Sequence, residues 1–194
     1  MTSSRCTSLK NVCLGLLLLA GSILAGGCVP VTTLLAIDVV RDEREPRAYW
    51  QDNKAEMDIR FSIYRNKTIS DTNVSVTIWN AVVLLTGEVP DQQAIDRILD
   101  IAKSHHYTRQ IVNRIELAGR TNAASRVNDS WLTGRVKTAL VVSRTVDPTR
   151  FKVVTERANV YLMGLVTSAE AAAAVMIVRS VPGVVRVIKV FEYI

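Results

Sequence analysis

Apolar positions between residues 128 and 142 recur with the period of a helix. They stand at i, i+4, i+7 and i+8: Leu132, Val136, Ala139 and Leu140. This spacing places them on one side of an α-helix, so the pattern predicts a helix that buries one face. Either Asp129 or Ser130 is a candidate N-cap for it.

The residues that follow predict two strands, a second helix and a last strand. Strands over 151–155 and 160–166 flank a short polar turn. Ser168 is the candidate cap of an alanine-rich helix over 169–181, which Pro182-Gly183 ends, and a strand over 184–193 follows. The predicted order of this unit is α-β-β-α-β.

The same pattern occurs earlier in the chain, at an offset of 77 residues. Residues 82–89 match residues 159–166, and Gly87 aligns with Gly164. In the earlier copy Asp91 is the candidate cap of the second helix. We therefore expect an α+β protein of two tandem domains, each with two helices on a three-stranded mixed sheet.

The N-terminus has the features of a secretory signal peptide. Basic residues precede an apolar run over 12–24, and small residues then lead to Cys28. The run is shorter than the roughly 20 residues that a membrane-spanning helix needs. We expect residues 1–27 to be removed, which leaves no transmembrane helix.

Removal of that segment would leave Cys28 as the only cysteine. It would take away Cys6 and Cys13, so no intramolecular disulfide and no cysteine-based metal site is expected. The mature chain then divides into a leader over 28–50, a first domain over 51–118, a polar linker over 119–127 and a second domain over 128–194.

Charge and candidate chemistry favour binding over catalysis. The net charge of +6 suits anionic partners such as phospholipid head groups, although ordinary surface charge explains it equally well. His105 and His106 are adjacent, so on a helix they cannot share a metal ion, and we interpret them as an exposed helix end. Glycine-rich phosphate loops are absent, and no Ser-His-Asp arrangement can be assembled. We expect no enzyme activity, cofactor or metal, and export from the cytoplasm argues against nucleic acid.

The segment Leu24-Ala25-Gly26-Gly27-Cys28 resembles the lipobox of bacterial lipoproteins. That resemblance implies cleavage before Cys28 and acylation, including palmitate, of its side chain. Simple secretion with an unmodified cysteine is the alternative. Val29 stands where an aspartate marks retention in the inner membrane, so the resemblance implies the outer membrane and its periplasmic face.

The repeated unit resembles a BON domain, most closely in the second copy. The matching segments are Asn159–Val166, the alanine-rich helix and Val181-Pro182-Gly183-Val184. Together with the lipobox, the layout resembles the dual-BON outer-membrane lipoproteins of the DolP type. The first copy departs at His106-Tyr107, where the family usually has a glycine.

The resemblance implies a non-catalytic protein that binds anionic phospholipid and supports envelope integrity. It places lipid contact on the first helix of the second domain, at Trp131, Arg135, Thr138 and Val141. An exposed tryptophan beside basic residues suits a membrane interface. The alternative is that Trp131 packs against the first domain.

Two further expectations concern partners and glycines. The competing function is an interaction module for an envelope protein, such as a barrel assembly component or an amidase regulator. Gly87 and Gly164 lie within strands, where glycine usually marks a close backbone approach, so we expect structural roles for both.

Overall fold

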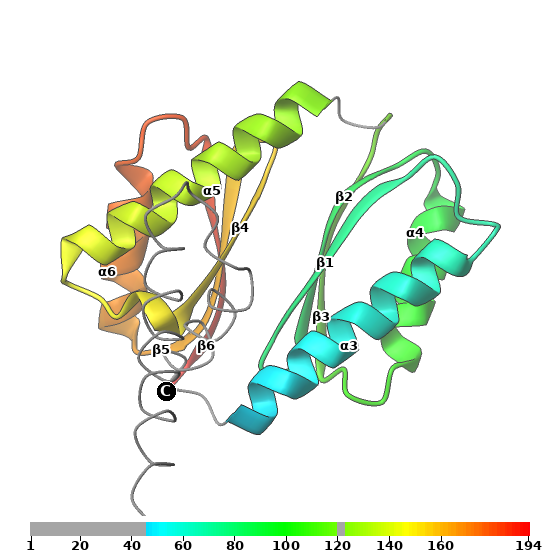
Figure 1. Cartoon of the computed structure of the whole chain (residues 1–194), viewed down its shortest axis with the longest axis horizontal. Coiled ribbons are helices and arrows are strands. Elements are labelled where there is room, and N and C mark those ends of the chain that lie inside the picture. Colours follow the sequence, from blue (N-terminus) through cyan, green and yellow to red (C-terminus); the bar gives the residue numbers. More distant parts are fainter. Residues whose placement is uncertain (1–45, 120–122) are drawn as a thin grey trace, which may run out of the picture. The chain divides into compact units, whose positions relative to one another are not determined.

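The computed structural model describes residues 46–119 and 123–194, which form two domains with the same element order (Figure 1). The first contains helix α3 (Pro46–Arg65), strands β1 (Asn73–Trp79) and β2 (Val82–Val89), helix α4 (Gln92–Ser104) and strand β3 (Gln110–Leu117). The second contains helix α5 (Ala123–Ser143), the 3₁₀ turn η1 (Pro148–Arg150), strands β4 (Phe151–Glu156) and β5 (Asn159–Val166), helix α6 (Ser168–Arg179) and strand β6 (Arg186–Tyr193). The predicted α+β class and tandem α-β-β-α-β units are confirmed.

Each domain has a mixed sheet whose central strand is the one that carries the repeated glycine. In the first sheet the order is β1-β2-β3, with β1 and β2 antiparallel and β2 and β3 parallel. The second sheet has the order β4-β5-β6 with the same directions. The parallel pair requires a crossover, and the crossover is the second helix of each domain.

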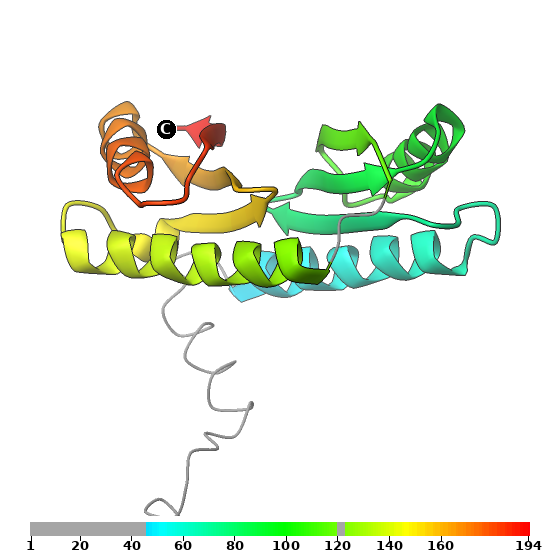
Figure 2. The same ribbon diagram turned by 90° about the horizontal axis from the view of Figure 1, so that it is seen from above.

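The two helices of each domain cover one face of its sheet (Figure 2). In the first domain α3 contributes Ala55, Ile59 and Ile63 to a buried core with β2 and α4. In the second, α5 contributes Leu132, Val136 and Leu140 to the equivalent core, as its apolar spacing predicts.

The central strands are buried on their other face as well. Every residue of β2 is buried, although successive side chains of a strand point to opposite faces. Its Val82 and Leu84 join Tyr161 and Met163 of β5 in a separate buried cluster, together with Trp79. The two domains therefore pack through the faces of their sheets that the helices leave open, within one compact unit of the chain.

The starts of three helices differ from the expectation. Helix α5 begins at Ala123, inside the expected linker, because residues 123–127 contain no helix breaker. Helix α3 begins at Pro46, inside the expected leader. The cap of α6 is Thr167 rather than Ser168, because Thr167 and Glu170 form a reciprocal capping box, whereas Asp91 caps α4 as predicted.

Gly87 lies where strand β1 approaches closely, and Gly164 lies where the end of η1 does. Gly87 has a φ of +115°, and a Cβ there would come within 1.8 Å of the carbonyl oxygen of Asn73. A Cβ on Gly164 would lie 2.5 Å from the carbonyl oxygen of Arg150. Both positions leave no room for a side chain, which is a structural reason for glycine.

Candidate functional site

Helix α5 is buried on one side and open to solvent on the other. Trp131 is 59% exposed, and Thr138 and Val142 follow it after two and three turns. At 100° per residue these three positions lie within about 40° of one another on the helix. Val141 is also exposed, about 80° around the axis from Trp131.

A basic side chain is held against the exposed tryptophan. The guanidinium carbon of Arg135 lies 4.6 Å from the centroid of the Trp131 ring, which is a cation–π geometry. The same guanidinium donates a hydrogen bond of 3.0 Å to the carbonyl oxygen of Pro182. Arg135 is thus fixed at the surface beside Trp131, and Thr138 bonds back to the carbonyl oxygen of Gly134. Trp131 does not belong to the buried cluster between the domains, and most of its side chain is open to solvent, so the structure favours the exposed position over packing against the first domain.

Asp129 has a different role from the predicted helix cap. It lies within α5, is buried, and accepts hydrogen bonds of 2.9 and 2.8 Å from the backbone nitrogens of Arg157 and Ala158. These two residues form the turn between β4 and β5 and have positive φ values of 49° and 59°. The carboxylate therefore fixes this turn against the helix, although the backbone of such a turn favours glycine or asparagine.

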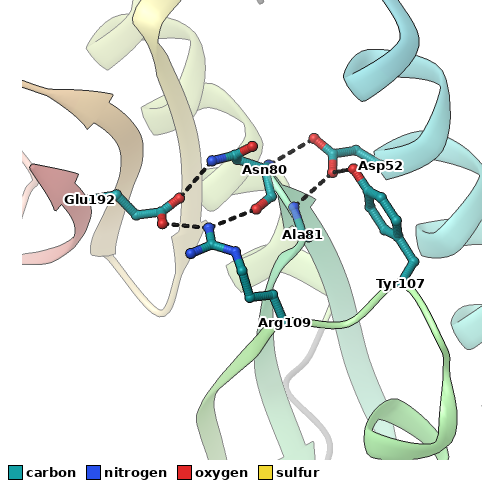
Figure 3. Close-up of polar contacts among 6 residues, drawn as sticks. All are labelled: Asp52, Asn80, Ala81, Tyr107, Arg109 and Glu192. Carbon is teal, nitrogen blue, oxygen red and sulfur yellow. Dashed lines mark hydrogen bonds and ion pairs between the residues drawn. The ribbon is translucent and has the colours of Figure 1, made fainter. Parts of the chain in front are cut away.

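The first domain repeats this arrangement. Asp52 of α3 accepts hydrogen bonds of 2.8 and 3.0 Å from the backbone nitrogens of Asn80 and Ala81 (Figure 3). The hydroxyl of Tyr107 donates a further hydrogen bond of 3.0 Å to the same carboxylate. Tyr107, where the first copy departs from the family pattern, thus links the end of α4 to α3. This pair was not predicted, although the offset of 77 residues, which relates Asp52 to Asp129, is a signal in the sequence that could have identified it.

Polar contacts surround the apolar cluster between the domains. Glu192 of β6 accepts a hydrogen bond of 3.0 Å from the side-chain amide of Asn80 and forms an ion pair with Arg109 (Figure 3). Arg157 donates to Glu116 over 2.6 Å. These contacts were not predicted, although the unbroken apolar runs of β2 and β5 are typical of strands covered on both faces.

One acidic group at this interface titrates near neutrality. The pKa of Glu156 is raised from 4.5 to about 7, first by burial and then by the negative charges of Glu88 and Asp129, while Arg157 opposes the shift. Because its pKa is higher in the folded than in the unfolded chain, the protonated group stabilises the fold. That stabilisation is complete below about pH 4.5 and is lost as the pH rises through about 7.

Glu156→Gln should therefore remove part of the pH dependence of stability. The amide resembles the protonated acid. At pH 8 the free energy of unfolding of the variant should therefore exceed that of the parent by about 2 kcal/mol, and at pH 4.5 the two free energies should be equal. Urea denaturation at both pH values measures this, with the exposed Asp100→Asn as control. Equal gains at both pH values would show that folding does not raise the pKa of Glu156.

Within the described residues, neither the histidines nor any apolar helix provides a further candidate site. His105 and His106 stack at 4.8 Å between ring centroids, and His105 lies 3.6 Å from a carboxylate oxygen of Asp58. Over residues 46–119 and 123–194, no three His, Cys, Asp or Glu side chains are placed to hold a metal ion. In that same part of the chain no helix is long and apolar enough to cross a bilayer. Cys28 lies outside the described residues.

Comparison with known proteins identifies relatives of both domains. A family model described as "BON domain" matches residues 51–119 and 128–194. The outer membrane lipoprotein DolP of Haemophilus influenzae is 31% identical over 182 residues, covering 92% of this chain and 94% of its own. A 21 kDa hemolysin of Actinobacillus pleuropneumoniae is 29% identical over 154 residues, or 79% of each chain. Among solved structures, CdsD, a structural protein of the type III secretion system of Chlamydia trachomatis, covers 74% of this chain and 63% of its own with 12% identity and a TM-score of only 0.30.

Proposed function

Because this chain belongs to the BON-domain family, as a dual-BON chain of the DolP type, we propose that it is a non-catalytic lipoprotein of the outer membrane. Cys28 carries the lipid anchor on the periplasmic face, and α5 of the second domain binds anionic phospholipid. Through this binding the protein supports the integrity of the envelope. The name of the Haemophilus influenzae relative supports the location.

The observation that carries the lipid proposal is the ordered pair of Trp131 and Arg135 on the open side of α5. A tryptophan ring settles among lipid head groups because it has an apolar body and a polar N–H. A basic residue near an anionic membrane surface contributes about 1 kcal/mol. The opposite side of α5 is committed to the core of the second domain, so this face is free to meet a membrane.

Co-sedimentation of residues 29–194 with vesicles tests this proposal without the anchor. Binding should require phosphatidylglycerol in the vesicles and weaken with salt, because screening reduces the attraction between Arg135 and the head groups. Trp131→Ala should lower the partition coefficient about fivefold, and Arg135→Glu about tenfold. Each removes one member of the pair without touching the buried side of α5.

Matched substitutions on α6 separate this effect from a general loss of apolar or basic surface. Met176→Ala removes an exposed apolar side chain, and Arg179→Glu reverses an exposed charge; both should bind as the parent does. If the parent binds neither anionic nor neutral vesicles, the proposal that α5 recognises lipid is wrong. Binding to a protein of the envelope would then be the function to test.

A further inference from the structure

Helix α3 of the first domain is apolar on two opposite sides. Its buried side packs on the first sheet through Ala55, Ile59 and Ile63. Four large side chains lie on the other side, within about 60° of one another at 100° per residue. They form what we term the α3 stripe: Trp50 (64% exposed), Met57 (67%), Phe61 (57%) and Tyr64 (86%).

A row of this kind needs an explanation. Single exposed apolar residues are ordinary, but a contiguous exposed patch usually marks an interaction surface. The α3 stripe runs over four turns of one helix, from Trp50 to Tyr64. The core of the first domain is already complete on the other side of α3, so folding alone does not require these side chains.

Basic residues border the α3 stripe on one side. Arg47, Lys54 and Arg65 are exposed and lie about 40° to 60° around the helix from Trp50. The guanidinium carbon of Arg65 lies 5.2 Å from the centroid of the Phe61 ring. The acidic Asp58 beyond them is paired with Lys54 over 2.9 Å. An apolar row with a basic border complements the acyl chains and anionic head groups of a membrane surface.

The internal repeat places the α3 stripe on the counterpart of the proposed lipid face. At the offset of 77 residues, Phe61 corresponds to Thr138 and Tyr64 to Val141. At both of these positions the first domain has the larger, aromatic side chain. Lys54 corresponds to Trp131, so at this position the first domain has a basic residue where the second has an aromatic one.

The position of α3 along the chain adds to this argument. It begins at Pro46, 18 residues after Cys28 by 46 − 28. An extended tether of this length spans at most about 60 Å. Anchoring at Cys28 would therefore keep α3 within this distance of the bilayer, which favours even weak contacts with it.

We propose that the α3 stripe is a second membrane-contact surface, which enters the head-group region of the bilayer to which Cys28 is anchored. Trp50, Phe61 and Tyr64 insert among the head groups, and the basic border meets their phosphates. The inference takes its anchor from the proposed function, but the contact itself is separate from that of α5. The first domain thereby contacts the membrane directly, and not only through the chain that leads to Cys28.

Quenching of tryptophan fluorescence by brominated acyl chains tests the two surfaces separately. The chain has three tryptophans: Trp50 on α3, Trp131 on α5 and the buried Trp79. Residues 28–194, which contain every described helix and strand, are coupled through the thiol of Cys28 to a maleimide lipid in brominated vesicles of phosphatidylethanolamine and phosphatidylglycerol. Trp131→Phe reports on Trp50, Trp50→Phe reports on Trp131, and the double variant gives the background from Trp79.

The proposal expects quenching in Trp131→Phe above the background of the double variant. Quenching in Trp50→Phe alone would overturn it while leaving the proposed function of α5 intact. Quenching in Trp131→Phe alone would support the α3 surface and contradict α5. If neither variant is quenched, both surfaces are excluded.

A binding measurement adds a second readout. Phe61→Ser combined with Tyr64→Ser should lower the partition coefficient about tenfold, because two exposed aromatic rings no longer enter the bilayer. Both residues are exposed, so the fold should be retained, which circular dichroism checks. Met176→Ser on α6 is the matched control and should bind normally. Unchanged binding of the double variant would also overturn the proposal.

Discussion

Gly87→Ala should destabilise the first domain by about 3 kcal/mol or more, the largest effect that we expect from a single methyl group in this chain. The φ of +115° is one that residues with a Cβ rarely adopt, and the added carbon would overlap the carbonyl oxygen of Asn73. Gly87 pairs with Val74 of β1 and Ile115 of β3, so the strain would spread to both neighbours of the central strand. Urea denaturation followed by circular dichroism measures the change.

Gly134→Ala is the matched control, with an effect of opposite sign. Gly134 lies in the exposed part of α5, and nothing lies within 4 Å of an added Cβ. Alanine in the interior of a helix is favoured over glycine by about 0.5–1 kcal/mol, so this variant should be slightly more stable than the parent. If Gly87→Ala unfolds at the same urea concentration as the parent, the close approach of β1 is wrong.

Asp129→Ala should lower the free energy of unfolding by about 3 kcal/mol. The substitution removes the acceptor of two backbone N–H groups from a turn whose residues already have positive φ. These donors would then have no partner from α5, and the contact between α5 and the β4–β5 turn would loosen. Thermal unfolding and the hydrogen-exchange rate of the Ala158 amide both report on this loss.

Ser130→Ala distinguishes this role from helix capping. Ser130 is exposed, and its hydroxyl bonds only to the carbonyl oxygen of Arg126 within the helix. Its replacement should change stability by less than about 0.5 kcal/mol. Comparable losses in Ser130→Ala and Asp129→Ala would contradict the turn-anchoring role of Asp129.

Local patterns predicted the elements of this fold well. The spacing of Leu132, Val136 and Leu140 identified the buried side of α5, because helical period and burial are directly linked. Asp91 was identified as a cap because its contact with Ala94 lies within one turn. The choice of Ser168 over Thr167 failed by one residue, since the pairing of Thr167 with Glu170 decides between two adjacent hydroxyls.

Long-range contacts were harder to predict, for a physical reason. The hydrogen bonds of Asp129 join residues 28 and 29 positions apart, so no local motif contains them. An aspartate near the start of a helix reads as a cap when only its neighbours are considered. The interdomain cluster of Trp79, Tyr161 and Met163 likewise depends on how two sheets meet.

The candidate lipid face was predictable as a surface but not in its detail. The helical period alone put Trp131 outside the buried stripe of α5, and the structure agrees. The stacking of Arg135 on Trp131 and its bond to Pro182 depend on side-chain geometry that spacing does not determine. The spacing of Trp50, Met57, Phe61 and Tyr64 is a signal for the α3 stripe, but helical spacing alone does not tell a buried apolar side from an exposed one.

The polar contacts between the domains are two versions of one contact. Asn80 and Arg157 are equivalent at an offset of 77, and their partners Glu192 and Glu116 are equivalent at 76. Each domain thus contributes the same two positions, and each position contacts the other one in the partner domain. This is the arrangement of an isologous interface in a two-fold dimer, here within a single polypeptide. Such an interface is closed, because the patch on each domain is covered by the equivalent patch on the other domain. Two separate chains with this surface would pair only at sufficient concentration, whereas the covalent link between the two domains makes their association independent of concentration.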